Sequence, residues 1–103
     1  MSVYFLRRAS GGPIKIGYSW NPRVRAEALR TTYREPMDIL GVLPGKRWYE
    51  CELHRRFAHS VVSGEWFEET PELIVFIAQH AAASEEVGRV SWTRPRRAFG
   101  KAA

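Results

Sequence analysis

Four polar side chains in the first half of the chain could together hydrolyse a phosphodiester bond: Tyr4, Lys15, Arg25 and Glu50. This reaction needs positive charge on the phosphate oxygens, a positioned water and usually a divalent ion. The planar guanidinium of Arg25 suits phosphate oxygens. One glutamate such as Glu50 is enough for a single Mg²⁺ or Mn²⁺ ion, because Mg²⁺ keeps several waters. Tyr4 and Lys15 could accept or relay a proton if neighbouring cations or desolvation lowered their pKa values.

The basic residues are segregated along the chain. Residues 1–56 hold nine arginines and two lysines against five acids, whereas residues 57–88 hold six acids and no lysine or arginine. Residues 89–103 add four arginines and Lys101. Cations gathered on one surface favour a polyanion, so DNA is the expected partner and RNA stays open. The plainer alternative is that these arginines only solvate a surface.

Length and composition indicate one small domain. A chain of 103 residues with one cysteine builds a single modest core and no intramolecular disulfide. No basic and apolar leader precedes the first predicted element, so a cytoplasmic location is expected. The longest apolar run, at 73–78, is far shorter than the roughly 20 residues that cross a bilayer, so a soluble protein without membrane contact is expected.

Local patterns predict elements in the order β-β-α-β-α-α. They are strands at 2–8 and 14–18, a helix at 22–33, a strand at 37–44, a helix at 45–59 and a helix from Thr70 to the alanines near 83. The Ser-Gly-Gly-Pro turn at 10–13 joins the first two strands into a hairpin. Ser19 or Asn21 caps the first helix, whose first position is Pro22. Thr70 caps the last helix.

Apolar spacing predicts which side of each helix faces the core. Val24 and Ala28 are expected to face inward on the first helix. Trp48, Leu53 and Phe57 are expected to form the apolar side of the second helix.

Three further residues each admit a functional and a structural interpretation. Gly17 permits close approach of backbone or substrate, or simply relieves crowding at a strand end. His54 lies one turn after Glu50 and either orients it or contacts phosphate, or is a buried structural histidine. Glu65 either helps to position a water or metal, or anchors the region of the last helix.

A second set of side chains is expected to contact nucleic acid: Arg23, Arg30, Arg55, Tyr18, Trp20 and His54. Trp20 could stack on a base, although it and Tyr18 could equally serve in packing. Arg55 lies on the solvated side of its helix, where it could steer DNA. Zinc is not expected, because Cys51 and the histidines lack compact ligand spacing.

Five short motifs follow one another in the chain: VYF at 3–5, KIG at 15–17, NPRVR at 21–25, ECELHRRF at 50–57 and GEWF at 64–67. Together they resemble the GIY-YIG nuclease superfamily, and more narrowly its T5orf172 and Mug113-like branch. The resemblance covers about residues 3–77. It implies an α/β (α+β) fold with a small three-stranded antiparallel sheet flanked by helices. Residues 1–83 would form this nuclease domain, and residues 84–103 a basic C-terminal tail that is flexible or docked by its aromatic residues.

The resemblance also implies roles for the four residues. Tyr4 matches a tyrosine that acts as general base or positions water, and Arg25 matches the arginine that binds the scissile phosphate. Glu50 matches the glutamate that holds the divalent metal. Lys15 stands where a second tyrosine is usual, and no asparagine matches the late one of the superfamily, since Asn21 is the only asparagine. The implied activity is a metal-dependent endonuclease acting on DNA, alone, as a homodimer or with a specificity partner.

Two other classes of protein remain open. A non-catalytic nucleic-acid-binding module would bind DNA in a salt-dependent manner without cleaving it. An interaction domain whose arginines serve protein partners would show no salt-dependent affinity for nucleic acid.

Overall fold

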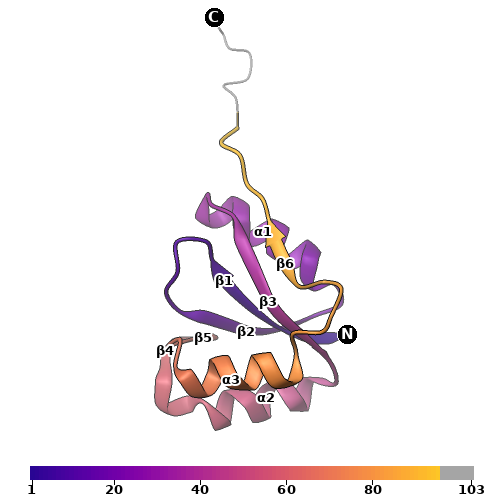
Figure 1. The fold of residues 1–103 in the computed structure, drawn as a ribbon, viewed down its shortest axis with the longest axis vertical. Coiled ribbons are helices and arrows are strands. Elements are labelled where there is room, and N and C mark those ends of the chain that lie inside the picture. The colour runs from indigo at the N-terminus through magenta and orange to yellow at the C-terminus, as the bar shows by residue number, and fades with distance from the viewer. Residues whose placement is uncertain (96–103) are drawn as a thin grey trace, which may run out of the picture.

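A six-stranded antiparallel sheet with helices on both faces forms the centre of the molecule (Figure 1). It is seen in a computed structural model that describes residues 1–95. The elements are β1 (Ser2–Arg8), β2 (Ile14–Ser19), α1 (Pro22–Tyr33), β3 (Met37–Pro44), α2 (Arg47–Arg56), the 3₁₀ turn η1 (Ala58–Ser60), β4 (Val61–Ser63), β5 (Trp66–Phe67), α3 (Pro71–His80) and β6 (Gly88–Val90). Within this part of the chain, no helix has the length and apolarity to cross a bilayer.

The sheet is larger than the sequence predicted. Its strand order is β4-β5-β2-β1-β3-β6, so the three predicted strands form its middle. Three short strands, of two or three residues each, extend both edges: β4, β5 and β6. The predicted three-stranded sheet and the order β-β-α-β-α-α are therefore wrong in detail. Strands this short carry no alternating pattern of their own and form only by pairing with a neighbour.

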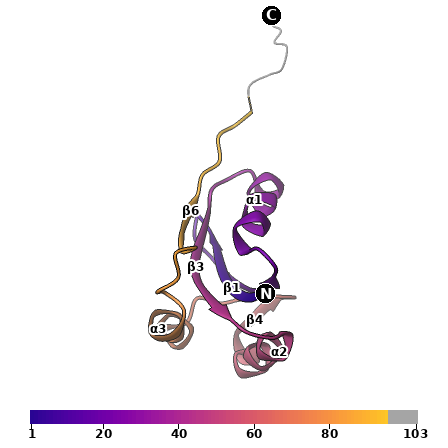
Figure 2. The same cartoon turned by 90° about the vertical axis from the view of Figure 1, so that its right-hand side faces the viewer.

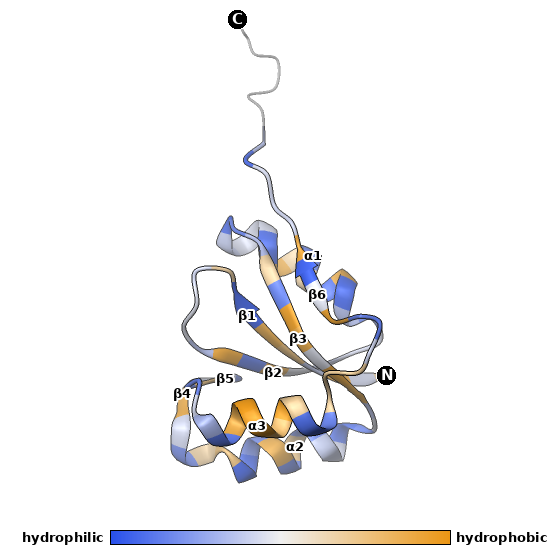
Figure 3. Cartoon of the chain, viewed as in Figure 1, coloured by the Kyte–Doolittle hydropathy of each residue, from blue (hydrophilic) through white to orange (hydrophobic). Residues whose placement is uncertain are grey.

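The two faces of the sheet carry separate apolar clusters. On β1, Tyr4 and Leu6 belong to the cluster under α1, whereas Val3 and Phe5 belong to the cluster that includes residues of α2 and α3. This division follows from the alternation of side chains along a strand. Figure 2 shows α1 on one side of the sheet and α3 on the other. Figure 3 shows the apolar colouring concentrated on the strands and on α3.

Helix α1 begins where the sequence predicted. The Asn21 side chain accepts hydrogen bonds from the backbone nitrogens of Arg23 and Val24 at 3.1 and 3.2 Å, and Pro22 follows it. The helix ends at Arg34, which takes a left-handed conformation with φ of 59°. The cap and the proline together set the direction in which α1 leaves the end of β2.

The predicted inward face of α1 is wrong. Val24 is 57% exposed and Ala28 is also exposed, whereas Ala26 and Leu29 are buried against the sheet. The small Ala26 lets the helix lie close to the strands. A narrow apolar stripe of this kind is ambiguous in sequence, because apolar residues such as Val24 and Ala28 also stand on the exposed side of the helix.

Helix α2 is shorter than the predicted range of 45–59, since the chain turns into η1 after Arg56. Leu53 and Phe57 are buried, as predicted. Trp48 is 66% exposed, so its assignment to the apolar side was wrong. It lies in the first turn of α2, before the helix meets the core.

The C-terminal part of the described chain returns to the sheet. The Thr70 side chain accepts a hydrogen bond from the Leu73 nitrogen at 3.2 Å, which confirms the predicted cap of α3. The helix ends at His80 instead of near residue 83. Strand β6 then pairs with β3, so the sheet continues past residue 83 into the predicted tail. The rest of that tail, residues 96–103, lies outside the described residues.

Candidate active site

The side chain of Tyr4 lies across Gly17 in the middle of the sheet. The two residues face each other on β1 and β2. A Cβ atom on Gly17 would lie 2.7 Å from Tyr4 Cε2 and even closer to its Cζ and hydroxyl oxygen. Tyr4 is only 2% exposed. The absence of a side chain at Gly17 therefore creates the space for the ring, which answers the question of why a glycine stands in this strand.

The Tyr4 hydroxyl lies among charged groups from three other parts of the chain. Burial raises the pKa of Tyr4 above its ordinary value of 10.0, and the Arg25 guanidinium opposes this by hydrogen bonding and charge. The negative charges of Glu65 and Glu50 raise the pKa further. The sequence hypothesis that neighbouring cations lower this pKa is not met, because desolvation outweighs Arg25. Tyr4 is thus a protonated phenol at neutral pH, able to donate a hydrogen bond.

Lys15 is on the same face of the sheet as Tyr4 and is 8% exposed. Its Nζ donates to Glu65 Oε1 at 2.8 Å and lies 5.5 Å from the centre of the Trp66 ring. Trp66 in turn packs edge-on against Tyr33 of α1, with ring centres 5.8 Å apart. Glu65 therefore pairs with the Lys15 ammonium group and holds it in place.

Glu65 is the residue whose role the sequence left open. It lies in the turn between β4 and β5, and its backbone oxygen accepts a hydrogen bond from the Ile16 nitrogen at 2.9 Å. The structure thus ties it to β2 and Lys15, and not to α3. The GEWF motif was visible in the sequence, but the pairing with a lysine 50 positions away was not.

Glu50 is a buried carboxylate on α2, with 6% of its surface exposed. Its basic neighbours are Arg47, with Nη1 3.9 Å from Oε1, and His54, with Nε2 3.8 Å from Oε2. Both distances exceed that of a hydrogen bond. A buried carboxylate whose basic neighbours lie beyond hydrogen-bond distance is costly, and such groups commonly hold a metal ion or perform chemistry.

His54 fastens α2 to the sheet. Its Nε2 lies 2.8 Å from the backbone oxygen of Ile16. The Ile16 nitrogen already bonds to the Glu65 oxygen, and His54 of α2 takes up the Ile16 oxygen at the same edge of β2. His54 also packs edge-on against Phe67, with ring centres 5.0 Å apart. This geometry favours the structural interpretation of His54, and through it Glu50 is carried to the edge of β2.

The donor set fits a sparsely coordinated, hydrated metal ion. Among residues 1–95, no three His, Cys, Asp or Glu side chains form a group that could hold a metal. Zinc, which needs three or four protein ligands, does not fit. Mg²⁺ and Mn²⁺ suit a single carboxylate such as Glu50, because they take their other ligands from water and substrate phosphates.

Comparison with known protein families decides to which family the chain belongs. The model of the T5orf172 domain matches residues 1–89. The chain is a member of the T5orf172 domain family. The match confirms the narrower part of the resemblance, and this family is associated with nuclease-like and DNA-binding proteins. No curated protein and no solved structure matches the chain significantly.

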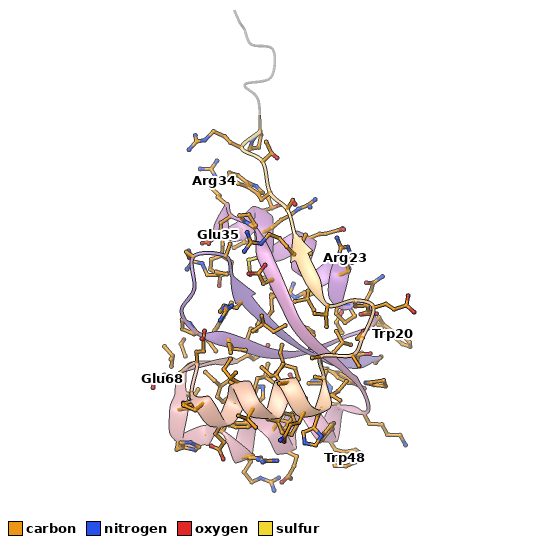
Figure 4. All side chains as sticks on the ribbon, viewed as in Figure 1. Trp20, Arg23, Arg34, Glu35, Trp48 and Glu68 are labelled. Atoms are coloured by element: carbon orange, nitrogen blue, oxygen red, sulfur yellow. The ribbon has the colours of Figure 1, made fainter. Side chains whose placement is uncertain are left out.

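The remaining predicted contact residues of this T5orf172 domain fall into two groups. The first group lies where β2 passes into α1, close to Arg25 in the chain. Trp20 is 81% exposed there, and Arg23 is exposed beside it (Figure 4). Tyr18 is half-buried, donates to the Gly45 oxygen at 3.2 Å and lies under Arg47, whose Cζ is 5.2 Å from the ring centre.

The second group is already engaged within the T5orf172 domain. Arg30 donates to the backbone oxygen of Ser91 at 3.0 Å and so holds the chain that follows β6. Arg55 donates to Glu52 at 3.0 Å on the exposed side of α2. These two arginines belong to different parts of the surface, and the structure does not bring them together.

Proposed function

We propose that this T5orf172 domain is a metal-dependent endonuclease of the GIY-YIG type that hydrolyses phosphodiester bonds in DNA. One observation carries the proposal. Lys15 and Glu50 are the charged side chains that the described chain buries, and both were selected from sequence for phosphodiester chemistry. Tyr4 lies on the same face of the sheet as Lys15, and the charges of Arg25 and Glu50 act on its hydroxyl. Buried charges are costly, and a fold retains them where they are paired or functional.

Each side chain has a role that follows from its environment. Arg25 is exposed beside Tyr4, so its guanidinium would bind the phosphate that is to be cleaved. Lys15, held by Glu65, would add a fixed positive charge next to that phosphate. The raised pKa of Tyr4 suits a hydrogen-bond donor to a phosphate oxygen or a water better than a general base.

Glu50 would hold the Mg²⁺ or Mn²⁺ ion. When bound, such an ion supplies positive charge to the phosphate and promotes loss of a proton from water. In hydrolysis, the water oxygen forms a bond to phosphorus while the bond from phosphorus to the leaving deoxyribose oxygen breaks. The proton lost by the attacking water passes to solvent, and the leaving oxygen takes up a proton from solvent. Arg25 and Lys15 would stabilise the negative charge that gathers on the phosphate oxygens during this exchange.

Nicking of supercoiled plasmid by the purified protein tests the proposal. We expect nicking with Mg²⁺ or Mn²⁺, none with EDTA, and its loss in Glu50→Gln and Arg25→Ala. Arg89→Ala is the matched control, since Arg89 is a guanidinium on β6 that pairs with Asp38 at 2.7 and 3.0 Å. Nicking that persists in Glu50→Gln, or that is insensitive to EDTA, would refute the proposal.

A non-catalytic nucleic-acid-binding module is the second candidate. One observation favours it, namely that Lys15 pairs with Glu65 at 2.8 Å, because a lysine held by a carboxylate is less available to a phosphate. Such a module would bind DNA with a strong dependence on salt and would not nick plasmid with either metal ion.

A further inference from the structure

Two exposed tryptophans lie near the same end of the sheet. Ser2 pairs with both Ser19 and Pro44, so the ends of β2 and β3 lie on either side of the start of β1. Trp20 follows Ser19 directly, and Trp48 lies four residues after Pro44. Figure 4 shows both side chains on the side of the molecule where these strands end.

Both indoles are more exposed than packing would require. Trp20 is 81% exposed and Trp48 is 66% exposed, and they are the most exposed of the large apolar side chains in residues 1–95. Trp48 lies 5.8 Å from the ring of Tyr49, which covers one side of it at most. Large aromatic side chains left in water at one place commonly mark a binding surface.

The two chain segments that carry the tryptophans are basic. Residues 17–26 and 44–49 contain three arginines and one lysine and no acid. Arg23, Lys46 and Arg47 are exposed. We call Trp20, Arg23, Lys46, Arg47 and Trp48 together the two-tryptophan surface. Its charge is complementary to a phosphate backbone and not to a second copy of this basic chain.

We propose that the two-tryptophan surface binds unpaired nucleotides, so that the substrate of this domain is single-stranded nucleic acid or a junction with a single-stranded arm. An indole stacks on a base only when one face of that base is free. In a duplex, neighbouring bases cover both faces, whereas unpaired bases can be splayed onto aromatic side chains. Alternating aromatic and cationic side chains are typical of proteins that follow a single strand.

The surface leads directly to the candidate active site. Tyr4 is two residues from Ser2 on β1, and Arg25 lies in the first turn of α1, five residues after Trp20. A strand whose bases stack on Trp20 would therefore have a phosphate near Arg25. This inference rests on the proposed function, because it names the substrate of that nuclease. The binding that it predicts can be tested without cleavage.

Binding measured in EDTA tests the inference, because no cleavage is expected there. The probes are a fluorescently labelled oligothymidylate strand and a duplex of the same length, followed by anisotropy at one salt concentration. We expect the strand to bind more tightly than the duplex. Trp20→Ala and Trp48→Ala should each weaken binding of the strand about fivefold or more and affect the duplex much less.

Two further variants test whether the loss of affinity comes from lost stacking of bases on the indoles. The other causes would be a smaller apolar surface or misfolding. Val24→Ala removes an exposed apolar side chain between the same arginines and should not change either affinity. Trp48→Phe keeps an aromatic face and should restore part of the affinity. The dependence of binding on salt concentration should be the same in the tryptophan variants as in wild type, because the phosphate contacts remain.

Equal affinity for strand and duplex, or tryptophan variants that bind the strand as wild type does, would overturn the inference. If plasmid nicking is intact in that case, the proposed function stands and only the inference fails. Absence of binding to any nucleic acid would refute both. Loss of a dimer in Trp48→Ala, seen by sedimentation with unchanged strand binding, would assign the surface to a second copy and also overturn the inference.

Discussion

Replacing Gly17 with alanine tests the packing at the centre of the site. The backbone of Gly17 is not left-handed, so alanine can adopt it. The added Cβ would lie 2.7 Å or less from the buried ring of Tyr4, which must move. Overpacking of this kind costs about 1–3 kcal/mol, whereas alanine is better than glycine within a strand by about 0.5–1 kcal/mol. We expect the free energy of unfolding to fall by about 1–2 kcal/mol.

Thermal and urea unfolding followed by circular dichroism would measure this loss. For a domain of this size it corresponds to a fall in Tm of roughly 5–15 °C. Gly45→Ala is the matched control, because its nearest new contact is the edge of the Tyr49 ring at 3.3 Å. We expect that variant to lose less stability.

A double-mutant cycle with Tyr4→Leu shows whether the ring is the cause. Leucine does not reach the position of Tyr4 Cζ, so Gly17→Ala should cost little or nothing in that background. The coupling energy should then be about 1 kcal/mol or more. An unchanged stability of Gly17→Ala, or the same loss with leucine at position 4, would refute the packing argument.

Three further predictions concern charge and capping. Glu50→Gln should abolish nicking yet keep or raise Tm by up to a few degrees, because it removes a buried charge whose basic neighbours, Arg47 and His54, lie beyond hydrogen-bond distance; a large fall in Tm would contradict this. Asn21→Ala should lower the free energy of unfolding by about 1 kcal/mol through loss of two cap hydrogen bonds, measured in urea, and an unchanged midpoint would count against the cap. Bonds from Ser10 and Arg8 hold the pKa of Glu35 below its ordinary value of 4.5, so this stabilisation is present above that pH and is lost as pH falls through the lowered pKa. Glu35→Gln should therefore melt below wild type at pH 7, with a gap that narrows as pH falls below 4.5; a gap independent of pH would contradict the ion pair.

The local features of the fold were readable in the sequence. Asn21 and Thr70, each followed by proline, predicted the starts of α1 and α3, because capping depends on groups within one turn of chain. The glycine-rich turn predicted the β1–β2 hairpin for the same reason. The third long strand also carried its own apolar pattern. The resemblance of five motifs reached the T5orf172 family, which the match over residues 1–89 confirms.

Only the tertiary structure decided the environment of each candidate residue. The pairing of Lys15 with Glu65 joins β2 to a turn far along the chain, and β5 exists only because it pairs with β2. The inward face of α1 depended on which side meets the sheet, so Ala26 is buried and Val24 is not. Such contacts depend on distances between distant segments, which neither spacing nor composition contains.

The identity of the site residues could be read from the sequence, whereas their chemical environment depended on the tertiary structure. The sequence by itself selected Tyr4, Arg25 and Glu50 and a basic character that suits a polyanion. Folding then buried Tyr4 over Gly17 and raised its pKa, because desolvation acts only when neighbours from other strands and helices exclude water. Residue types set which chemistry was available to this chain, and packing set the protonation state in which that chemistry begins.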